Sequence, residues 1–167
     1  MEKITVLSVI VIMVIGGLFN YVAAAENANY SGRYLLERPK KASADSTDSS
    51  LEVIQKPDMI EITLSASGTL TTKKCPFDGT EGDYKSQGVL LGKCKAQLKV
   101  KELIIESLYM SSNNFRVYNK QRWQLSKDGK ILKIKSDVSF PDFSFDVNSI
   151  MSNYTSNTAR YIRVENP

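Results

Sequence analysis

Histidine is absent from this chain of 167 residues. Its absence removes the commonest general base and the commonest transition-metal ligand, and with them any Ser-His or Cys-His nucleophile pair. No other nucleophile motif stands out, and the sequence pattern places no two carboxylates together for acid–base work. We therefore predict that the protein is not an enzyme and has no catalytic residues, no cofactor and no metal site.

The excess of charge is small. The formal net charge is +4, from 22 Lys and Arg against 18 Asp and Glu. The densest run of cations, Lys93, Lys95, Lys99 and Lys101, would lie along the wet face of one strand. Such a face can attract phosphate, a polyanionic glycan or an anionic membrane, or it can keep the strand soluble and unpaired at its edge. It lacks interleaved aromatic residues, so we predict no nucleic-acid partner.

Cysteine is scarce, with only Cys75 and Cys94 in the chain. In an oxidising compartment such a pair forms a disulfide, whereas two thiols alone make a poor zinc site. Closing a loop of about 20 residues would stabilise the fold by roughly 3 kcal/mol if the effect is the lost chain entropy. The alternative is a pair of buried free thiols.

The long apolar run of the sequence is confined to its N-terminus. One cation at Lys3 precedes a stretch without charge over residues 4–19, and small residues at 23–25 precede Glu26. This order of charged start, apolar middle and small-residue site is typical of a cleavable secretory signal. The alternative is an uncleaved membrane anchor, for which the apolar stretch is short and is interrupted by Gly16-Gly17.

These features divide the chain into two parts. We predict an apolar signal helix within a signal peptide over residues 1–25 and a single domain over residues 26–167. The protein would then be secreted or periplasmic, and it would contact a membrane only through a leader that had not been removed.

The exported part shows a period of two in place of helical periodicity. Ile60, Ile62 and Leu64 alternate with polar residues, and residues 94–98 and 132–140 repeat the pattern. Strands with one buried and one wet face are typical of antiparallel sheets. Turn signals, of which Asp128-Gly129 is the strongest, separate these segments. We predict strands at 31–38, 50–56, 59–66, 69–75, 88–98, 102–109, 114–126, 130–140 and 156–165.

Short connections between successive strands favour an up-and-down meander without crossover helices. We predict an all-β antiparallel fold of eight or nine strands that closes, or nearly closes, into a barrel, since closure removes exposed edges. A barrel of about eight strands can fill itself with side chains or hold one small ligand. In such a meander Cys75 and Cys94 would face each other across a long hairpin, in agreement with a disulfide.

The segment Arg122–Ile134, which reads RWQLSKDGKILKI, carries a family resemblance. It resembles the "RW-LS-DGK-L-I" segment of small secreted lipocalin-like β-meander proteins, most of them bacterial. Gly32-Arg33-Tyr34 at the first strand, and Leu103–Ser107 beside that family's "L-V-I-E-S" strand, follow the same order. The resemblance covers roughly residues 31–140. It implies a lipocalin-like barrel and says almost nothing about activity.

Aromatic residues are the candidates for a ligand site. Tyr34, Phe115 and Trp123 could form the wall of a cavity for an apolar ligand, and Tyr84 is among the further aromatic candidates for its lining. Asn119 and Gln121 share the strand face of Trp123, which hints at a partly wet lumen.

Two functions follow from these patterns. The first is a secreted, non-catalytic lipocalin-like binding protein, expected to be a monomer, that holds a small apolar or amphipathic ligand or a protein partner. The alternative is an envelope or surface interaction protein with a solid core. Such a protein would contact a protein or polyanionic partner through its loops or its Lys-rich face.

Overall fold

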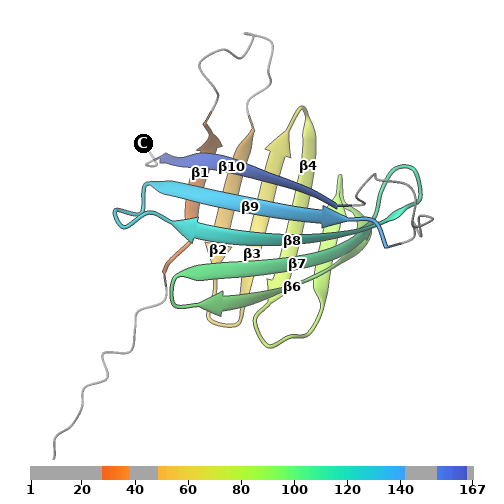
Figure 1. Cartoon of the computed structure of the whole chain (residues 1–167), viewed down its shortest axis with the longest axis horizontal. Coiled ribbons are helices and arrows are strands. Elements are labelled where there is room, and N and C mark those ends of the chain that lie inside the picture. Colours follow the sequence, from red (N-terminus) through yellow and green to blue (C-terminus); the bar gives the residue numbers. More distant parts are fainter. Residues whose placement is uncertain (1–27, 38–48, 142–153, 165–167) are drawn as a thin grey trace, which may run out of the picture.

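The computed structural model describes residues 28–37, 49–141 and 154–164 (Figure 1). In these ranges all regular secondary structure is β-strand, and ten antiparallel strands form one closed barrel in which β10 pairs with β1. The strands are β1 (Gly32–Leu36), β2 (Ser50–Gln55), β3 (Met59–Ala66), β4 (Thr69–Pro76), β5 (Gly82–Ser86), β6 (Val89–Lys99), β7 (Glu102–Met110), β8 (Arg116–Leu125), β9 (Ile131–Ser139) and β10 (Tyr154–Val164). Figure 1 shows β1 to β4 crossing β6 to β9 steeply, so that the barrel has two layers. The described residues contain no helix that could cross a bilayer.

The predicted all-β antiparallel meander is confirmed, and each of the nine predicted strands has a counterpart. The strand count is corrected to ten, because β5 lies between residues 75 and 88, where we predicted no strand. Its sequence GDYKS has no apolar alternation that could have announced a strand. The predicted signal helix and the 1–25 leader lie outside the described residues.

Two tight hairpins connect β3 to β4 and β5 to β6. Both central residues of each turn have positive φ, at 50° and 75° for Ser67-Gly68 and at 49° and 81° for Gln87-Gly88. This is the backbone of a type I′ turn, whose twist matches that of the flanking strands. The turns therefore set the register of the two hairpins, in which Ser65 pairs with Leu70 and Ser86 with Val89.

Gly92 lies where two strands approach closely. It pairs with Tyr84 on β5 and with Tyr109 on β7, and the two tyrosine rings meet edge to face with centroids 4.7 Å apart. A Cβ atom on Gly92 would lie 2.1 Å from the carbonyl oxygen of Leu108. Only glycine allows this approach without a shift of the backbone.

Gly92→Ala is therefore expected to lower the free energy of unfolding by about 1–3 kcal/mol, as overpacking does in a well-packed interior. Urea denaturation followed by the fluorescence of the single tryptophan would measure this. Gln97→Ala, an exposed change on the same strand, is the matched control and is expected to alter stability by less than about 0.5 kcal/mol. Equal midpoints for the two variants would contradict the close approach at Gly92.

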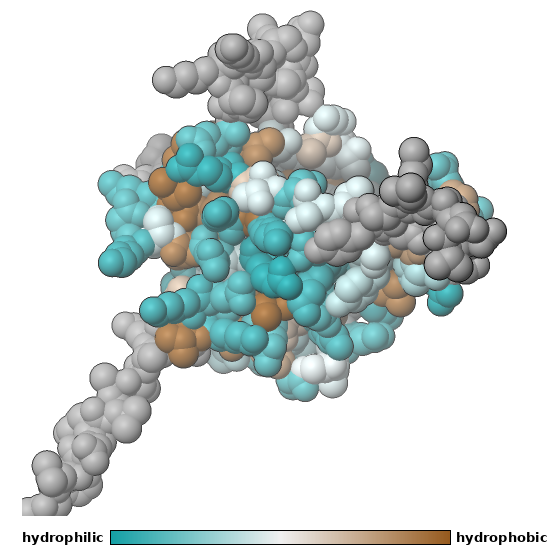
Figure 2. All heavy atoms as spheres, viewed as in Figure 1, coloured by the Kyte–Doolittle hydropathy of each residue, from teal (hydrophilic) through white to brown (hydrophobic). Residues whose placement is uncertain are grey.

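The outer face of the barrel is polar. Arg122 and Asp137 form an ion pair at 2.6 Å, and Lys120 and Glu106 form another at 2.9 Å. The face over β8, β9 and β10 is largely hydrophilic, with scattered hydrophobic residues (Figure 2). In β6 and β9 the alternating polar residues, such as Lys95 and Lys133, lie exposed on this outer surface, as the period of two predicted.

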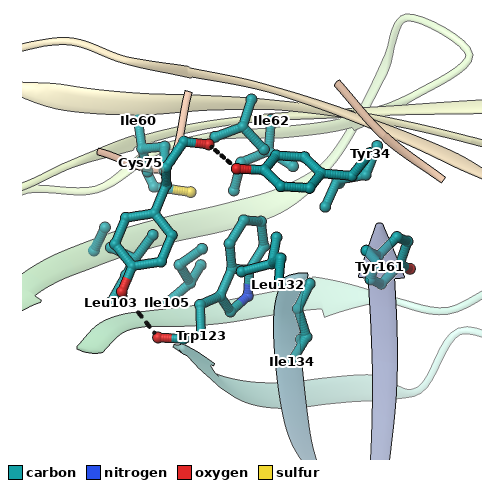
Figure 3. Close-up of a cluster of buried hydrophobic side chains, with 14 of the residues drawn as sticks. Tyr34, Ile60, Ile62, Cys75, Leu103, Ile105, Trp123, Leu132, Ile134 and Tyr161 are labelled. Atoms are coloured by element: carbon teal, nitrogen blue, oxygen red, sulfur yellow. Dashed lines mark hydrogen bonds between the residues drawn. The ribbon is translucent and has the colours of Figure 1, made fainter. Parts of the chain in front are cut away.

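The apolar core fills one end of the barrel, here called the closed end, which carries the β2–β3 turn. Figure 3 shows its side chains converging from strands on opposite sides of the barrel. Tyr30, from the segment before β1, is fully buried, and its hydroxyl donates to the carbonyl oxygen of Trp123 at 3.1 Å. The hydroxyl of Tyr34 donates to the carbonyl oxygen of Tyr30 at 2.8 Å. These bonds hold the residues just before β1, from Ala28 to Ser31, against the closed end of the barrel.

The predicted disulfide is confirmed between Cys75 on β4 and Cys94 on β6, both of them buried. The expected direct pairing of their strands is corrected, because β5 lies between them and pairs with both. Gly82 lets the three strands approach, since a Cβ atom there would collide with the carbonyl oxygen of Lys74. The disulfide therefore links β4 to β6 across the start of β5, and it does not join the two strands of a simple hairpin.

Candidate functional site

A cavity of about 280 Å³ lies inside the barrel, beyond the apolar core. Its lining comes from seven strands, β2 to β5 and β8 to β10. The apolar lining residues are Leu51, Ile62, Leu64, Trp123, Ile134, Ala159 and Tyr161, and the lining residues with polar groups are Thr71, Lys73, Tyr84, Asn119, Gln121, Ser136 and Asn157. The cavity therefore has an apolar part and a polar part.

The polarity of the lining changes along β8. Trp123 lies next to the core, and Gln121 and Asn119 follow it on the same inward face toward the other end of the barrel. The indole Nε1 of Trp123 donates to Gln121 Oε1 at 3.3 Å, and Gln121 Nε2 donates to Ser136 Oγ at 3.2 Å. This chain of hydrogen bonds fixes the Gln121 amide. Gln121 and Asn119 thus share the inward face of Trp123, as expected, and give this part of the lining its polar groups.

The Asn119 side chain is less satisfied. Its Oδ1 atom is buried and has no hydrogen-bond partner among the described residues. A buried polar atom of this kind is normally met by a water or a ligand. It therefore marks a place in the cavity where a polar group of a guest can bind.

Lys73 is the one cationic residue of the lining. It lies on β4 between Ile62 on β3 and Tyr84 on β5, and it is only 9% exposed. Its Nζ donates to Ser107 Oγ at 3.3 Å and lies 4.7 Å from the centroid of the Tyr84 ring. Burial lowers the pKa of the Lys73 ammonium to about 8. Burial also raises the pKa of the Tyr84 phenol, to about 12, so Tyr84 is neutral at physiological pH.

The cavity extends toward the end opposite the core, here called the open end, where the β3–β4 and β5–β6 turns lie. Asn157 on β10 is the exposed member of its lining. Several apolar side chains at the strand ends of this side are exposed, namely Leu70, Val89, Met110 and Phe115. An apolar rim beside a polar-lined mouth suits a guest that has both kinds of surface.

The three residues predicted to form a ligand wall occupy different places. Trp123 lines the cavity and is 1% exposed. Tyr34 is buried outside the cavity lining, where its hydroxyl also accepts a hydrogen bond from Arg163 Nη2 at 2.6 Å. Phe115 is 40% exposed on the loop between β7 and β8 at the open end. The structure thus does not gather these three side chains, and their contact with a ligand stays a prediction.

Sequence reasoning missed Lys73 as a lining residue. Lys73 alternates with Cys75 and Thr71, so the period of two would have placed it on the inward face. Tyr84 was a candidate for the cavity lining as an aromatic residue, and the structure places it there, although its strand carries no apolar alternation.

The Lys-rich face is partly neutralised by acids. Lys93 Nζ lies 3.0 Å from Asp83, and Lys95 Nζ lies 3.5 Å from Glu106. An outer hollow of about 440 Å³ is lined by lysines together with Glu106 and Asp78. Its lining is of mixed sign, which gives a polyanion little reason to prefer it.

No protein-family model matches the chain, and no curated protein matches it. The class that the fold defines is a closed antiparallel barrel with an interior cavity, an architecture able to hold one small ligand. The disulfide is consistent with an oxidising compartment outside the cytoplasm. Among the described residues no group of acids and cysteines is placed to hold a metal ion.

Proposed function

We propose that this is an exported, non-catalytic, lipocalin-like binding protein that holds one small amphipathic ligand inside its barrel. The observation that carries the proposal is the divided lining of the cavity, in which Trp123 and Ile134 give way to Gln121, Ser136 and Lys73. Ligand sites commonly combine an apolar wall with a few placed polar groups. The chain is expected to act as a monomer.

The size of the cavity limits the ligand. A volume of 280 Å³ equals roughly nine water molecules at about 30 Å³ each. A guest with on the order of ten non-hydrogen atoms would fill this space, such as a medium-chain lipid or a single-ring aromatic acid. Long-chain lipids would have to extend through the open end.

The alternative function, a surface interaction protein with a solid core, has less support. The interior contains a cavity with an unpartnered Asn119 acceptor, and the Lys93–Lys101 face carries paired acids of opposite charge. No specific observation on the outer surface favours a polyanionic partner over solvent.

The first test is native mass spectrometry of the protein purified from its own host. We expect the intact mass to exceed that of the oxidised polypeptide by one small molecule, which is released on denaturation. A bare polypeptide in repeated gentle preparations would speak for the solid-core alternative.

The second test fills the cavity. Ala159→Leu on β10 adds volume at a lining position opposite Ile134. We expect it to weaken ligand binding at least tenfold, because an added side chain occupies space that the guest needs. The matched control is Thr158→Leu, which adds similar bulk at the neighbouring exposed position of the same strand and should leave binding unchanged. Binding can be followed by the fluorescence of Trp123, which is the single tryptophan of the chain and lines the cavity. Equal loss of binding in both variants would argue against an interior site.

A further inference from the structure

We infer that the ligand carries a carboxylate, and that this carboxylate binds the ammonium group of Lys73. The inference rests on the proposed function and names the chemical class of the ligand for the same cavity. Four features of the described residues carry it: the donors that Lys73 leaves unused, the absence of an acid in the cavity, the polar groups around Lys73, and the cost of keeping its charge inside the barrel.

An ammonium group has three N–H donors. In the described part of the chain, Lys73 Nζ has one hydrogen-bond acceptor, Ser107 Oγ at 3.3 Å, which is a long bond. The ring of Tyr84 offers its face to the same cation at 4.7 Å. Neither partner carries a negative charge, so Lys73 has capacity for an anionic acceptor.

No carboxylate of the described residues lines the cavity. The acids on the strands around Lys73 belong to the outer face and pair with other lysines. Glu61 on β3 pairs with Lys56 at 2.7 Å, and Asp83 on β5 pairs with Lys93 at 3.0 Å. Glu106 on β7 pairs with Lys120. The positive charge inside the barrel therefore has no counter-ion from these strands.

The groups beside Lys73 fit a carboxylate. The Ser107 hydroxyl is buried and can rotate to donate its proton to an oxygen that also binds Lys73. The Asn119 amide has a buried end without a partner in the same cavity, and a 180° rotation of that amide would present its two N–H donors to the guest. The apolar wall formed by Ile62, Ile134 and Trp123 would then contact the rest of the ligand.

A charged lysine in such a place is costly to the empty protein. Buried charges are normally paired with a charge of opposite sign. Replacing an unpaired buried charge by an apolar side chain raises the stability of the fold. Its presence at a cavity wall is therefore better explained by binding than by folding.

The test compares three guests of one chain length, octanoate, 1-octanol and octylamine, on the full exported protein at pH 7. Trp123 fluorescence and calorimetry report the affinity. We expect octanoate to bind at least about tenfold more tightly than octanol, as a charge-assisted hydrogen bond would give, and octylamine to bind most weakly. In Lys73→Met, octanoate should lose at least about tenfold in affinity while octanol keeps its own.

Lys73→Arg keeps the positive charge but changes the shape of the side chain, so it separates the effect of the charge on binding from the effect of the shape. We expect it to retain the preference for octanoate over octanol, although with altered affinity. Thermal melting of each ligand-free variant shows that it is folded. Equal binding of octanoate and octanol by the wild type, or an unchanged preference in Lys73→Met, would overturn the carboxylate inference and leave the proposed function intact. Failure of all three guests to bind the wild type would overturn the carboxylate inference, and the proposed function would fail with it if native mass spectrometry also found a bare polypeptide.

Discussion

Lys73→Met is expected to raise the free energy of unfolding of the ligand-free protein by about 3 kcal/mol at pH 7. The reason is the buried ammonium, because burial lowers the pKa of Lys73 from its ordinary 10.5 to about 8. The difference corresponds to about 3 kcal/mol at about 1.4 kcal/mol for each tenfold change in proton affinity. Methionine has a similar shape and removes the charge. Urea denaturation of the two proteins measures the gain.

The lowered pKa of Lys73 also determines whether the free energy of unfolding rises or falls with pH. Between pH 8 and 10.5 the unfolded chain keeps the lysine proton while the folded protein releases it, so the unfolded state binds more protons and stability rises with pH. Below pH 8 both states are charged and the full cost is present. The advantage of Lys73→Met should therefore be constant below pH 8 and shrink as the pH approaches 10.

The other titratable groups that face the cavity do not disturb this window. Tyr84 and Tyr161 line the cavity and the Tyr109 ring contacts that of Tyr84, and burial raises the pKa of each phenol. Ionisation of these phenols lowers stability as the pH rises, which is opposite to the effect of Lys73. It is confined to pH values above 10 and is the same in the wild type and in Lys73→Met.

Lys74→Met is the matched control for Lys73→Met. Lys74 is the next residue of β4, its side chain is 64% exposed, and its nearest acid is Glu61 at 3.9 Å. This change should alter stability by less than about 0.5 kcal/mol at any pH between 7 and 10. If Lys73→Met proves no more stable than Lys74→Met, the interior charge costs the empty protein nothing and the energetic argument for a carboxylate guest fails.

The binding and stability predictions for Lys73 are linked. A residue that weakens the empty barrel and strengthens the complex makes stability depend on the ligand, since a guest that binds only the folded state adds to its free energy of unfolding. Octanoate should therefore raise the melting temperature of the wild type more than that of Lys73→Met. The empty variant nonetheless starts from the higher value.

The sequence predicted those strands whose two faces differ in polarity. In β3 every second residue is apolar, and β9 follows the same period with Ser136 as the one polar member, so a period of two was enough to place Ile62 and Ile134 inside. In β5 no residue pattern separates the faces. That strand exists because β4 and β6 offer it hydrogen bonds and because Gly82 and Gly92 let neighbouring strands approach, which are tertiary causes.

The candidate site was predictable to a similar degree. Trp123 was placed in the lumen because its strand alternates, together with Gln121 and Asn119. Tyr34 lies on an inward face too, but its hydroxyl donates a hydrogen bond to the carbonyl oxygen of Tyr30. Tyr30 precedes the first strand and belongs to no periodic pattern, so this contact was not predictable. Lys73 could have been placed inside by its spacing from Cys75, but lysine is so rarely buried that spacing alone carries little weight.

Reduction of the Cys75–Cys94 disulfide is expected to lower the free energy of unfolding by about 3 kcal/mol and the melting temperature by roughly 10 °C. The bond closes a loop with a sequence separation of 19 residues. The disulfide also lies beside a short strand pairing, because β5 pairs with β4 over only three residues, Thr71 to Lys73. Oxidised protein and protein refolded in reductant can be compared by urea denaturation, which isolates the cross-link from the packing of the sulfur atoms.

The double variant Cys75→Ala/Cys94→Ala supplies the complementary measurement. Both sulfur atoms are buried, so the variant should be less stable than the reduced wild type because it also loses their packing. Two reactive thiols in the denatured, unreduced wild type would contradict the disulfide itself.

Lys73 lies two residues before Cys75 on the same inward face, and β5 carries the Tyr84 ring that the Lys73 ammonium contacts. Loss of the disulfide should therefore speed hydrogen exchange in β5 and weaken octanoate binding more than octanol binding, because it loosens the lysine before it loosens the apolar wall.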